Sequence, residues 1–366
     1  MFNNIYRNKK VLVTGHTGFK GSWITTWLIK LGANVVGISK DIPTNPSMFK
    51  ELKLEDGIKH FSEDIRDLSR MIEIISYEKP EFLFHLAAQP IVSTSYSESI
   101  ETISSNVMGT ANILEALKVS NHKCTAIIIT SDKAYDNVEQ VWGYKEDDKM
   151  GGKDVYSGSK GAAELIIKSY YHSFFRNENS NIKLAIGRAG NVIGGGDWAK
   201  DRIVGDCMQA WSKGKIVEIR APKATSPWQH VLEPLSGYLN LGAELYENDN
   251  LHGEGINFGP RAEQNHTVEE LLVDLSAYWD FEDINDAYKV TGNVPFHEAG
   301  LLKLNCDKAL FYLKWQANLE YKDTIKVTSE WYYDFYKTDK NILDKTLEQI
   351  SEYENMAKNK GLKWTE

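Results

Sequence analysis

Short apolar runs alternate with longer amphipathic segments through the first half of the chain. Each run is five or six residues long, which is the pattern of strands buried on both faces of a parallel sheet. These runs occupy residues 10–14, 34–39, 82–86 and 124–129. Between the first two runs, apolar residues recur at helical spacing and end at Gly32, where a helix would stop. The alternation predicts an α/β fold with a doubly wound parallel sheet of the Rossmann type.

The second half of the chain is expected to add a smaller α/β lobe. We expect the Rossmann domain over residues 1–190, with later segments returning to it, an interleaved lobe over 191–336, and a helical tail over 337–366. Apolar residues of the tail lie near helical spacing, so we expect it to pack as a helix.

A glycine-rich turn follows the first apolar run. Gly15, Gly18 and Gly21 stand at three-residue spacing between the expected strand and helix. Glycines let the backbone approach a pyrophosphate, and the helix N-terminus offers free N–H groups, so this context predicts a dinucleotide site. Asp41 lies twenty residues beyond Gly21, where a carboxylate takes the ribose hydroxyls of NAD. Because Lys40 beside it would suit a 2′-phosphate, NADP stays an open alternative.

A second polar cluster follows the run at 124–129. Ser131, Asp132 and Lys133 come at the carboxyl end of that expected strand, where open α/β sheets bind their ligands. Tyr156 and Lys160 stand four apart on one face of an expected helix. An ammonium group stabilises a nearby phenolate, so we expect a lowered pKa for Tyr156 and a role as a base in oxidising an alcohol. Tyr-x-x-x-Lys pairs also occur on ordinary helices, and only the glycine turn gives this one its meaning.

Composition excludes several other classes of function. The formal net charge of -9, without a basic stripe, argues against a nucleic-acid partner. No apolar run approaches the length of a membrane span, and the first residues lack a signal-peptide core. The three cysteines are far apart and lack metal-ligand spacing, so we expect a cytoplasmic protein with reduced thiols and no metal site.

Six motifs together resemble those of the extended short-chain dehydrogenase/reductase family. Within it, they are most similar to the CDP-glucose 4,6-dehydratases of bacterial deoxysugar pathways such as those for lipopolysaccharide O-antigens. The resemblance covers roughly residues 5 to 336, and its motifs lie at 15–23, 130–133, 141–144, 190–198, 227–238 and 257–260.

The resemblance implies a lyase reaction on a nucleotide sugar. In the family, tightly held NAD+ oxidises the sugar at C4, water leaves across C5 and C6, and the hydride returns to C6. Carried over, Tyr156 would take the C4 hydroxyl proton with help from Lys160, and Ser131 would bind the C4 oxygen. Asp132 would protonate the departing C6 hydroxyl and Lys133 would remove the C5 proton, which needs a protonated Asp132 and a neutral Lys133.

The resemblance also implies which residues contact the two ligands. The expected NAD contacts are Gly15, Thr17, Gly18, Phe19, Lys20, Gly21, Asp41, Asp64, Ile65, Leu86, Ala87, Ala88, Asn106, Thr130, Tyr156 and Lys160. The expected contacts with the nucleotide sugar are Gln89, Ser131, Asn191, Arg202, Arg220 and His230.

Three departures from the family pattern bear on the substrate lobe and the catalytic helix. Ser226 stands where the family usually carries an arginine that clamps a diphosphate. Gly205 replaces a usual proline, and Val155 and Gly158 replace the usual proline and serine around Tyr156. The reaction type is therefore better specified than the nucleotide sugar.

Other functions stay open from the sequence. These are dehydration of another nucleotide sugar, epimerisation or simple oxidation within the same superfamily, and, from a different class, a dinucleotide-binding scaffold without turnover. By resemblance, the long helices expected near 98–118 and 157–175 would pair two copies into a homodimer or a homotetramer.

Overall fold

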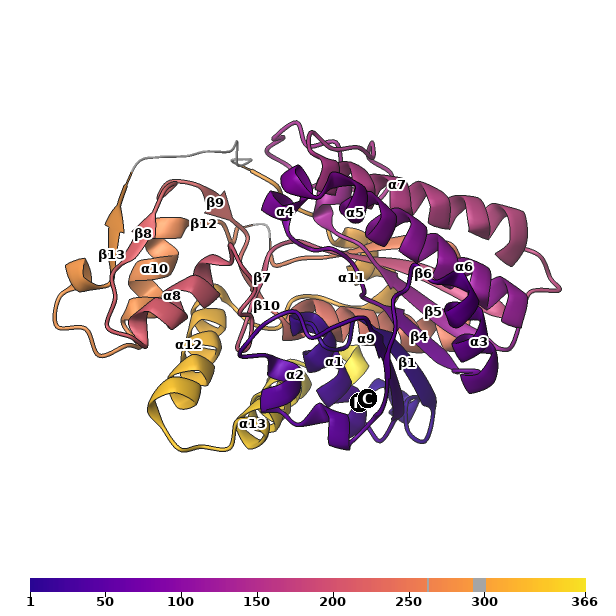
Figure 1. Ribbon diagram of the computed structural model, residues 1–366, viewed down its shortest axis with the longest axis horizontal. Coiled ribbons are helices and arrows are strands. Elements are labelled where there is room, and N and C mark those ends of the chain that lie inside the picture. Colours follow the sequence, from indigo (N-terminus) through magenta and orange to yellow (C-terminus); the bar gives the residue numbers. More distant parts are fainter. Residues whose placement is uncertain (262, 292–300) are drawn as a thin grey trace.

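The computed structural model describes residues 1–261, 263–291 and 301–366, and its main element is a parallel sheet of seven strands (Figure 1). The order across the sheet is β3-β2-β1-β4-β5-β6-β11, and every pair is parallel. The strands are β1 (Lys10–Thr14), β2 (Asn34–Ser39), β3 (Lys59–Ser62), β4 (Phe82–His85), β5 (Cys124–Ile129), β6 (Ile182–Ala189) and β11 (Gly255–Phe258). The predicted doubly wound α/β fold is confirmed.

Helices cover both faces of the sheet. Successive residues of a buried strand point to opposite faces, so they join two different apolar clusters. Val11 and Val13 of β1 join one cluster, with α1 (Phe19–Lys30) and α9 (Leu232–Glu247). Leu12 joins the other, with α3 (Leu68–Glu78), α6 (Gly109–Ser120) and α7 (Val155–Tyr170). The order reverses between β1 and β4, and ligands of such sheets bind at the carboxyl ends beside this reversal.

The helical region before α6 is not continuous. After α4 (Val92–Ser97) comes α5 (Ser99–Ile103), and a π-helical turn (Ser104–Met108) joins α5 to α6. A second π-helical turn (Tyr171–Phe175) extends α7.

The smaller lobe contains three two-stranded sheets and lies to the left in Figure 1. Its strand pairs are β7 (Val192–Ile193) with β10 (Gln229–His230), β8 (Val217–Ile219) with β13 (Tyr288–Val290), and β9 (Thr225–Ser226) with β12 (His266–Thr267). Its helices are α8 (Ile203–Trp211), α10 (Val268–Ser276) and α12 (Tyr321–Lys337). β11 and α11 (Asp307–Leu313) return to the main sheet.

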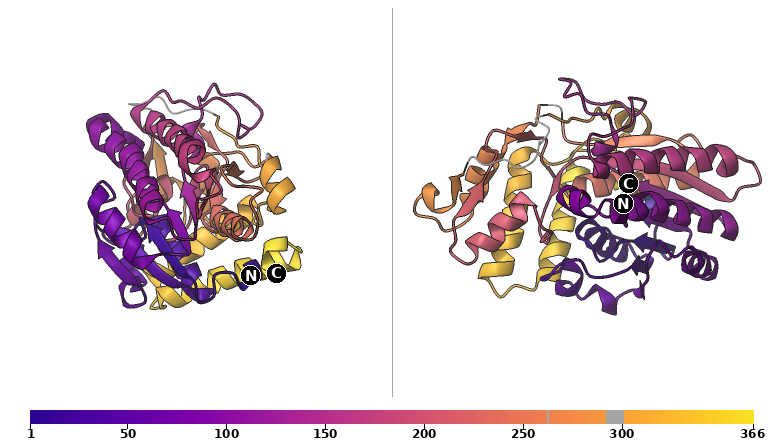
Figure 2. Two further views of the ribbon diagram at one scale, coloured as in Figure 1. Left: turned by 90° about the vertical axis from the view of Figure 1, so that its right-hand side faces the viewer. Right: turned by 45° about the horizontal axis from the view of Figure 1, so that its top comes forward.

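The tail forms α13 (Ile342–Asn359), which packs against α1 and α12. Glu354 of this helix accepts a hydrogen bond of 2.8 Å from Trp27 Nε1 and pairs with Lys30, both on α1. The two chain termini lie side by side (Figure 2), and the Met1 ammonium donates to the main-chain oxygen of Glu366 at 3.2 Å. The tail therefore braces the helix that starts at the glycine turn, and the short α2 (Met48–Glu51) also contacts that helix.

Candidate active site

The glycine turn between β1 and α1 leaves the start of α1 open to an anion. Gly15 has a φ of +74°, and a Cβ there would lie 2.7 Å from the main-chain nitrogen of Ala87. A Cβ at Gly21 would lie 2.0 Å from the carbonyl oxygen of Gly15, so the turn needs glycine at both positions. Gly18 is the N-cap of α1, which begins at Phe19, and brings no side chain to the first N–H groups. Free N–H groups at the positive end of a helix suit the pyrophosphate of a dinucleotide.

The chain after β2 is held next to this turn. Thr17 Oγ1 donates to the main-chain oxygen of Asp41 at 2.7 Å. The Asp41 side chain is exposed, and its carboxylate forms no ion pair with any of the described residues. Because the carboxylate is free at the end of the second strand, Asp41 can accept hydrogen bonds from ribose hydroxyls.

The chain after β3 presents a second carboxylate. Asp64 accepts from Arg66, whose Nη2 lies 2.6 Å from Asp64 Oδ2, and this hydrogen bonding lowers the pKa of Asp64. Ile65 fills the space left by Gly109 of α6, where a Cβ would lie 2.4 Å from Ile65 Cδ1. The Asp64 carboxylate and the Ile65 side chain are thus fixed beside the expected adenine position.

The loop after β4 lies directly against the glycine turn. Leu86 and Ala87 donate their main-chain N–H groups to Thr14, at 3.1 Å to the carbonyl oxygen and 3.2 Å to Oγ1. Ala88 follows with another small side chain. This close approach explains why Gly15 has no room for a side chain.

Asn106, in the π-helical turn before α6, ties this loop to the helix of Tyr156. Its Oδ1 accepts from Gln89 N at 2.8 Å, and its Nδ2 donates to Ser159 Oγ at 2.9 Å. Interruptions of this kind are frequent at functional sites. The Gln89 side chain, which was expected to face the substrate, instead donates to Ile91 O at 3.0 Å and Thr102 Oγ1 at 2.8 Å.

Ser131, Asp132 and Lys133 lie in a short 3₁₀ turn at the end of β5. Ser131 Oγ accepts from Lys133 N at 3.2 Å and donates to Asp132 Oδ1 at 2.8 Å. The other oxygen, Asp132 Oδ2, lies against Gly190, where a Cβ would be 3.0 Å away. Burial raises the pKa of Asp132, although Lys133 and Ser131 oppose the shift. A carboxyl group with a raised pKa is suited to donating a proton.

Tyr156 and Lys160 lie in the first turns of α7, which is capped by a hydrogen bond from Ser157 N to Asp154 Oδ1 at 2.9 Å. Burial raises the pKa of Tyr156 to about 12, with Arg202 opposing, and lowers the pKa of Lys160 to about 8. The Lys160 ammonium lies 5.9 Å from the centre of the Tyr156 ring. The expected fall in the Tyr156 pKa is therefore wrong, because burial outweighs the positive charge of Arg202.

Three cations and two carboxylates gather between the glycine turn and the smaller lobe. Burial, with Arg202 next, lowers the pKa of Lys20 to about 8, while Asp132 opposes this shift and Lys160 adds to it. Arg202 precedes α8, and its Nε lies 3.9 Å from Asp197 Oδ2. A concentration of positive charge favours phosphate groups, so these residues are candidates for binding a pyrophosphate.

The remaining expected substrate contacts lie in different settings. Asn191 Nδ2 donates to Ser226 Oγ at 3.0 Å. Ser226, which stands where the resemblance implies an arginine, therefore contacts an expected substrate residue. Arg220 is exposed at the end of β8. His230 is fully buried against Trp23, which lowers its pKa to about 3 and keeps it neutral. His230 was expected among the contacts with the nucleotide sugar, and the structure places its side chain in the core.

One buried network next to the site was not anticipated. Arg188 of β6 donates from Nε to Glu164 Oε1 at 2.7 Å and from Nη1 to the Tyr135 hydroxyl at 2.6 Å. Thr130 Oγ1, expected at the cofactor, donates instead to Glu164 at 2.6 Å. Glu164 follows Lys160 by one turn of α7, and the four-residue spacing of Tyr156, Lys160 and Glu164 was the signal that would have found it.

Two further findings concern metal ions and membranes. No group of three or more His, Cys, Asp or Glu side chains in the described part of the chain is placed to hold a metal ion. Across the same residues, no helix has the length and apolarity needed to span a membrane.

Comparisons with known proteins agree on the fold and on the type of site. Residues 12–191 match the family model described as GDP-mannose 4,6 dehydratase. The chain is 45% identical to the CDP-glucose 4,6-dehydratase of Salmonella typhimurium, over 90% of this chain and 92% of that protein. It is 23% identical to the CDP-paratose 2-epimerase of Salmonella typhi, over 88% and 98% of the two chains.

Solved structures with the same fold include a second kind of dehydratase and an epimerase. The dTDP-glucose 4,6-dehydratase of Streptomyces venezuelae, with NAD and TYD bound, superposes with a TM-score of 0.75 at 17% identity and covers 89% of this chain and 97% of its own. The UDP-glucose 4-epimerase of Thermotoga maritima, with UDP-glucose, gives a TM-score of 0.75 at 23% identity, over 90% and 100% of the two chains.

Proposed function

The chain belongs to the nucleotide-sugar 4,6-dehydratases of the extended short-chain dehydrogenase/reductase family, and from this we propose that it converts CDP-glucose to CDP-4-keto-6-deoxyglucose. It is then a hydro-lyase. The observation that carries the proposal is the turn at the end of β5. There a buried Asp132 of raised pKa is hydrogen-bonded to Ser131 and followed by Lys133, and the turn packs against α7, which carries Tyr156 and Lys160.

We propose NAD as the resident cofactor. Gly15, Gly18 and Gly21 would admit its pyrophosphate, Asp41 its adenosine ribose, and Lys160 its nicotinamide ribose. Bound NAD would supply reversible hydride transfer, from C4 of the sugar and later to C6. The chain itself has to orient the sugar, exclude water and move the protons.

Tyr156 takes the proton from the C4 hydroxyl during oxidation. Its pKa of about 12 in the ligand-free chain must fall for this step, and Arg202 already opposes the effect of burial. The Lys160 ammonium, one turn later on the same face of α7, adds a second positive charge. Ser131 Oγ, which donates to Asp132 Oδ1 at 2.8 Å, has to turn its hydroxyl to the C4 oxygen to hydrogen-bond it while the proton leaves.

Asp132 and Lys133 act in the elimination that follows. The new C4 ketone acidifies the C5 proton, and the Lys133 amine removes it. Asp132 donates its proton to the C6 hydroxyl, which leaves as water as the C5–C6 double bond forms. The raised pKa of Asp132 keeps the carboxyl group protonated closer to neutral pH, which this role requires.

The smaller lobe binds the nucleotide half of the substrate in this proposal. Lys20 and Arg202 face the place where its pyrophosphate would lie, and Asn191 is held at the end of β6 by Ser226. The lobe boundaries we propose are 191–336, after a dinucleotide-binding domain over 1–190, with the tail from 337.

We also propose a homodimer in the cytoplasm that serves deoxysugar synthesis. Exposed apolar side chains gather on the outer helices, which lie next to each other in Figure 1. Ile100 is 76% exposed and Leu165 is 57% exposed. The other exposed apolar residues on α5, α6, α7 and the two π-helical turns are Ile103, Met108, Val119 and Phe174. Pairing these helices with those of a second copy would cover the exposed apolar surface.

The test is incubation of the purified chain with CDP-glucose, with dTDP-glucose, UDP-glucose and GDP-mannose in parallel. The readouts are the alkali-induced absorbance of a 4-keto-6-deoxy sugar and the loss of one water by mass spectrometry. We expect turnover of CDP-glucose, and a rate lower by a factor of about 10² to 10⁴ with Asp132→Asn. If only a different nucleotide sugar is turned over, the substrate assignment would change and the dehydration reaction would stand. Interconversion of sugar epimers without loss of water would overturn the dehydratase assignment.

A further inference from the structure

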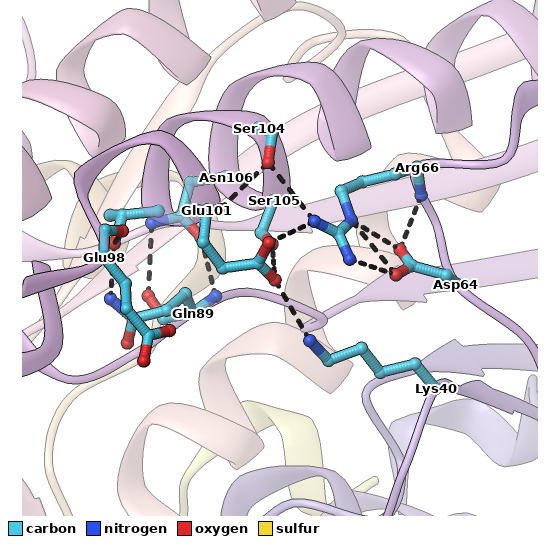
Figure 3. Close-up of polar contacts among 10 residues, drawn as sticks. Lys40, Asp64, Arg66, Gln89, Glu98, Glu101, Ser104, Ser105 and Asn106 are labelled. Carbon is cyan, nitrogen blue, oxygen red and sulfur yellow. Dashed lines mark hydrogen bonds and ion pairs between the residues drawn. The ribbon is translucent and has the colours of Figure 1, made fainter.

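Two cations at the ends of β2 and β3 share one carboxylate from α5 (Figure 3). Lys40 Nζ lies 3.1 Å from Glu101 Oε1, and Arg66 Nη1 donates to Glu101 Oε2. Arg66 also forms an ion pair with Asp64, which lies two residues after the end of β3. The side chains of Lys40, Arg66 and Glu101 are 48%, 33% and 30% exposed, so they form an accessible rim.

This rim surrounds the place proposed for the adenosine ribose. Lys40 immediately precedes Asp41, the carboxylate proposed to accept from the ribose hydroxyls. In dinucleotide-binding folds, a carboxylate at this strand end favours NAD, while a nearby cation accommodates the 2′-phosphate of NADP. The chain carries both kinds of group at one corner, so the presence of Asp41 alone does not decide the cofactor.

The position of Glu101 indicates which of the two cofactors this corner favours. With Glu101, the corner formed by Lys40, Asp41, Asp64 and Arg66 carries one net negative charge, and without it the corner would be neutral. The carboxylate occupies the two cations that would otherwise be free to meet a 2′-phosphate. A phosphate dianion at this corner would have to displace Glu101 or lie beside it, and both cost binding free energy.

We propose that Glu101 is a specificity residue for the cofactor, which makes the chain select NAD by occupying Lys40 and Arg66 at the ribose corner. This inference rests on the proposed function, since it needs a dinucleotide at the glycine turn. It concerns a carboxylate on α5, outside the strand ends that usually make this choice.

The experiment measures the dissociation constants of NAD+ and NADP+ by calorimetry, on protein freed of bound nucleotide. Glu101→Gln keeps the shape of the side chain and removes its charge. We expect the ratio of the two constants to shift about fivefold toward NADP+, as for a partly exposed ion pair, and the shift to shrink at high salt. Glu98→Gln is the matched control, because Glu98 is exposed on the same segment and has no ion pair among the described residues.

A second substitution assigns the effect to the freed cation. In a Glu101→Gln background, Lys40→Met should remove most of the gain in NADP+ affinity. On its own, Lys40→Met should weaken NADP+ binding several-fold and leave NAD+ binding unchanged, which tests the inference even if Glu101→Gln does not fold. An unchanged ratio in folded Glu101→Gln, with NAD+ still bound, overturns this inference alone. Failure of the unmodified chain to bind either dinucleotide overturns the proposed function as well.

Discussion

The two sides of the candidate site differ in how many of their polar groups are paired within the protein. On the dinucleotide side, Asp64 is fixed by Arg66, and Asn106 by Gln89 and Ser159. On the sugar side, four polar atoms of the segment 228–238 are buried without a hydrogen-bond partner among the described residues. They are Trp228 Nε1, Gln229 Oε1, His230 Nε2 and the Tyr238 hydroxyl.

This difference separates what is fixed before a ligand binds from what is not. Paired polar groups hold their positions, so the glycine turn and its neighbours are preorganised for a dinucleotide. Buried groups without partners carry a free-energy cost that a hydrogen bond would relieve. The segment 228–238, which runs from β10 of the smaller lobe into α9, is therefore the region where we expect rearrangement on binding a nucleotide sugar.

Asp132→Asn acts where the two sides meet and should have the largest effect. The amide has the shape of the carboxyl group but cannot donate an acidic proton, so dehydration should fall by a factor of about 10² to 10⁴. Binding of NAD+ should stay within about twofold, because Asp132 lies outside the dinucleotide side. Single-turnover mass spectrometry of the sugar, with calorimetry for the cofactor, measures the two effects separately. A parallel loss of both would show that Asp132 acts through the fold.

Gly21→Ala should abolish the preorganisation of the dinucleotide side. Its Cβ would lie 2.0 Å from the carbonyl oxygen of Gly15, so the turn has to move. We expect NAD+ affinity to fall by about a hundredfold or more, measured by calorimetry. Gly158→Ala, on α7, is the matched control because a Cβ there meets nothing within 4 Å. Equal losses in the two variants would contradict the role of the turn.

The pH dependence should report the buried Lys160 on the dinucleotide side. Burial lowers the pKa of its ammonium from 10.5 to about 8, so the positive charge is present below this pH and is lost above it. If that charge stabilises the Tyr156 phenolate, kcat/KM should fall as the pH rises through about 8, by roughly tenfold per pH unit. Measurement of kcat/KM across this pH range at constant ionic strength gives the slope of the decrease. A profile that keeps rising past pH 9 would exclude a need for the ammonium.

Ser226→Arg should have the smallest effect and should act on the sugar side alone. The resemblance implies an arginine there that clamps a diphosphate, so we expect CDP-glucose to bind about fivefold more tightly to this variant. Ser226→Ala, which removes only the hydrogen bond to Asn191, is the control and should weaken binding by about twofold. Titration of CDP-glucose into the NAD-loaded protein gives both numbers. Tighter NAD+ binding in the arginine variant would show that the two sides are not separable.

The elements that the sequence predicts well are those set by local patterns. The strands at 10–14, 34–39 and 124–129 were placed by apolar runs that need no knowledge of their neighbours. The three glycines of the turn were placed the same way, since their spacing follows from the geometry of one strand–helix junction. Tyr156 and Lys160 share a helix face because they are four residues apart.

The features that the sequence missed depend on burial and on distant partners. Nothing near Tyr156 in the chain indicates that burial raises its pKa to about 12. His230 was expected at the substrate, but Trp23, some 200 residues earlier, covers it in the core. The bridge of Glu101 to Lys40 and Arg66 joins three separate segments, and only the fold brings them together.

The fate of the hydrogen at C4 decides whether this chain is a dehydratase of the proposed kind. CDP-glucose carrying deuterium at C4 would be converted by the purified protein, and the product examined by NMR and mass spectrometry. The account predicts that the deuterium moves to C6 of a 4-keto-6-deoxy sugar while one water is lost. Deuterium that stays at C4, in an unchanged or epimerised sugar that has lost no water, would contradict it.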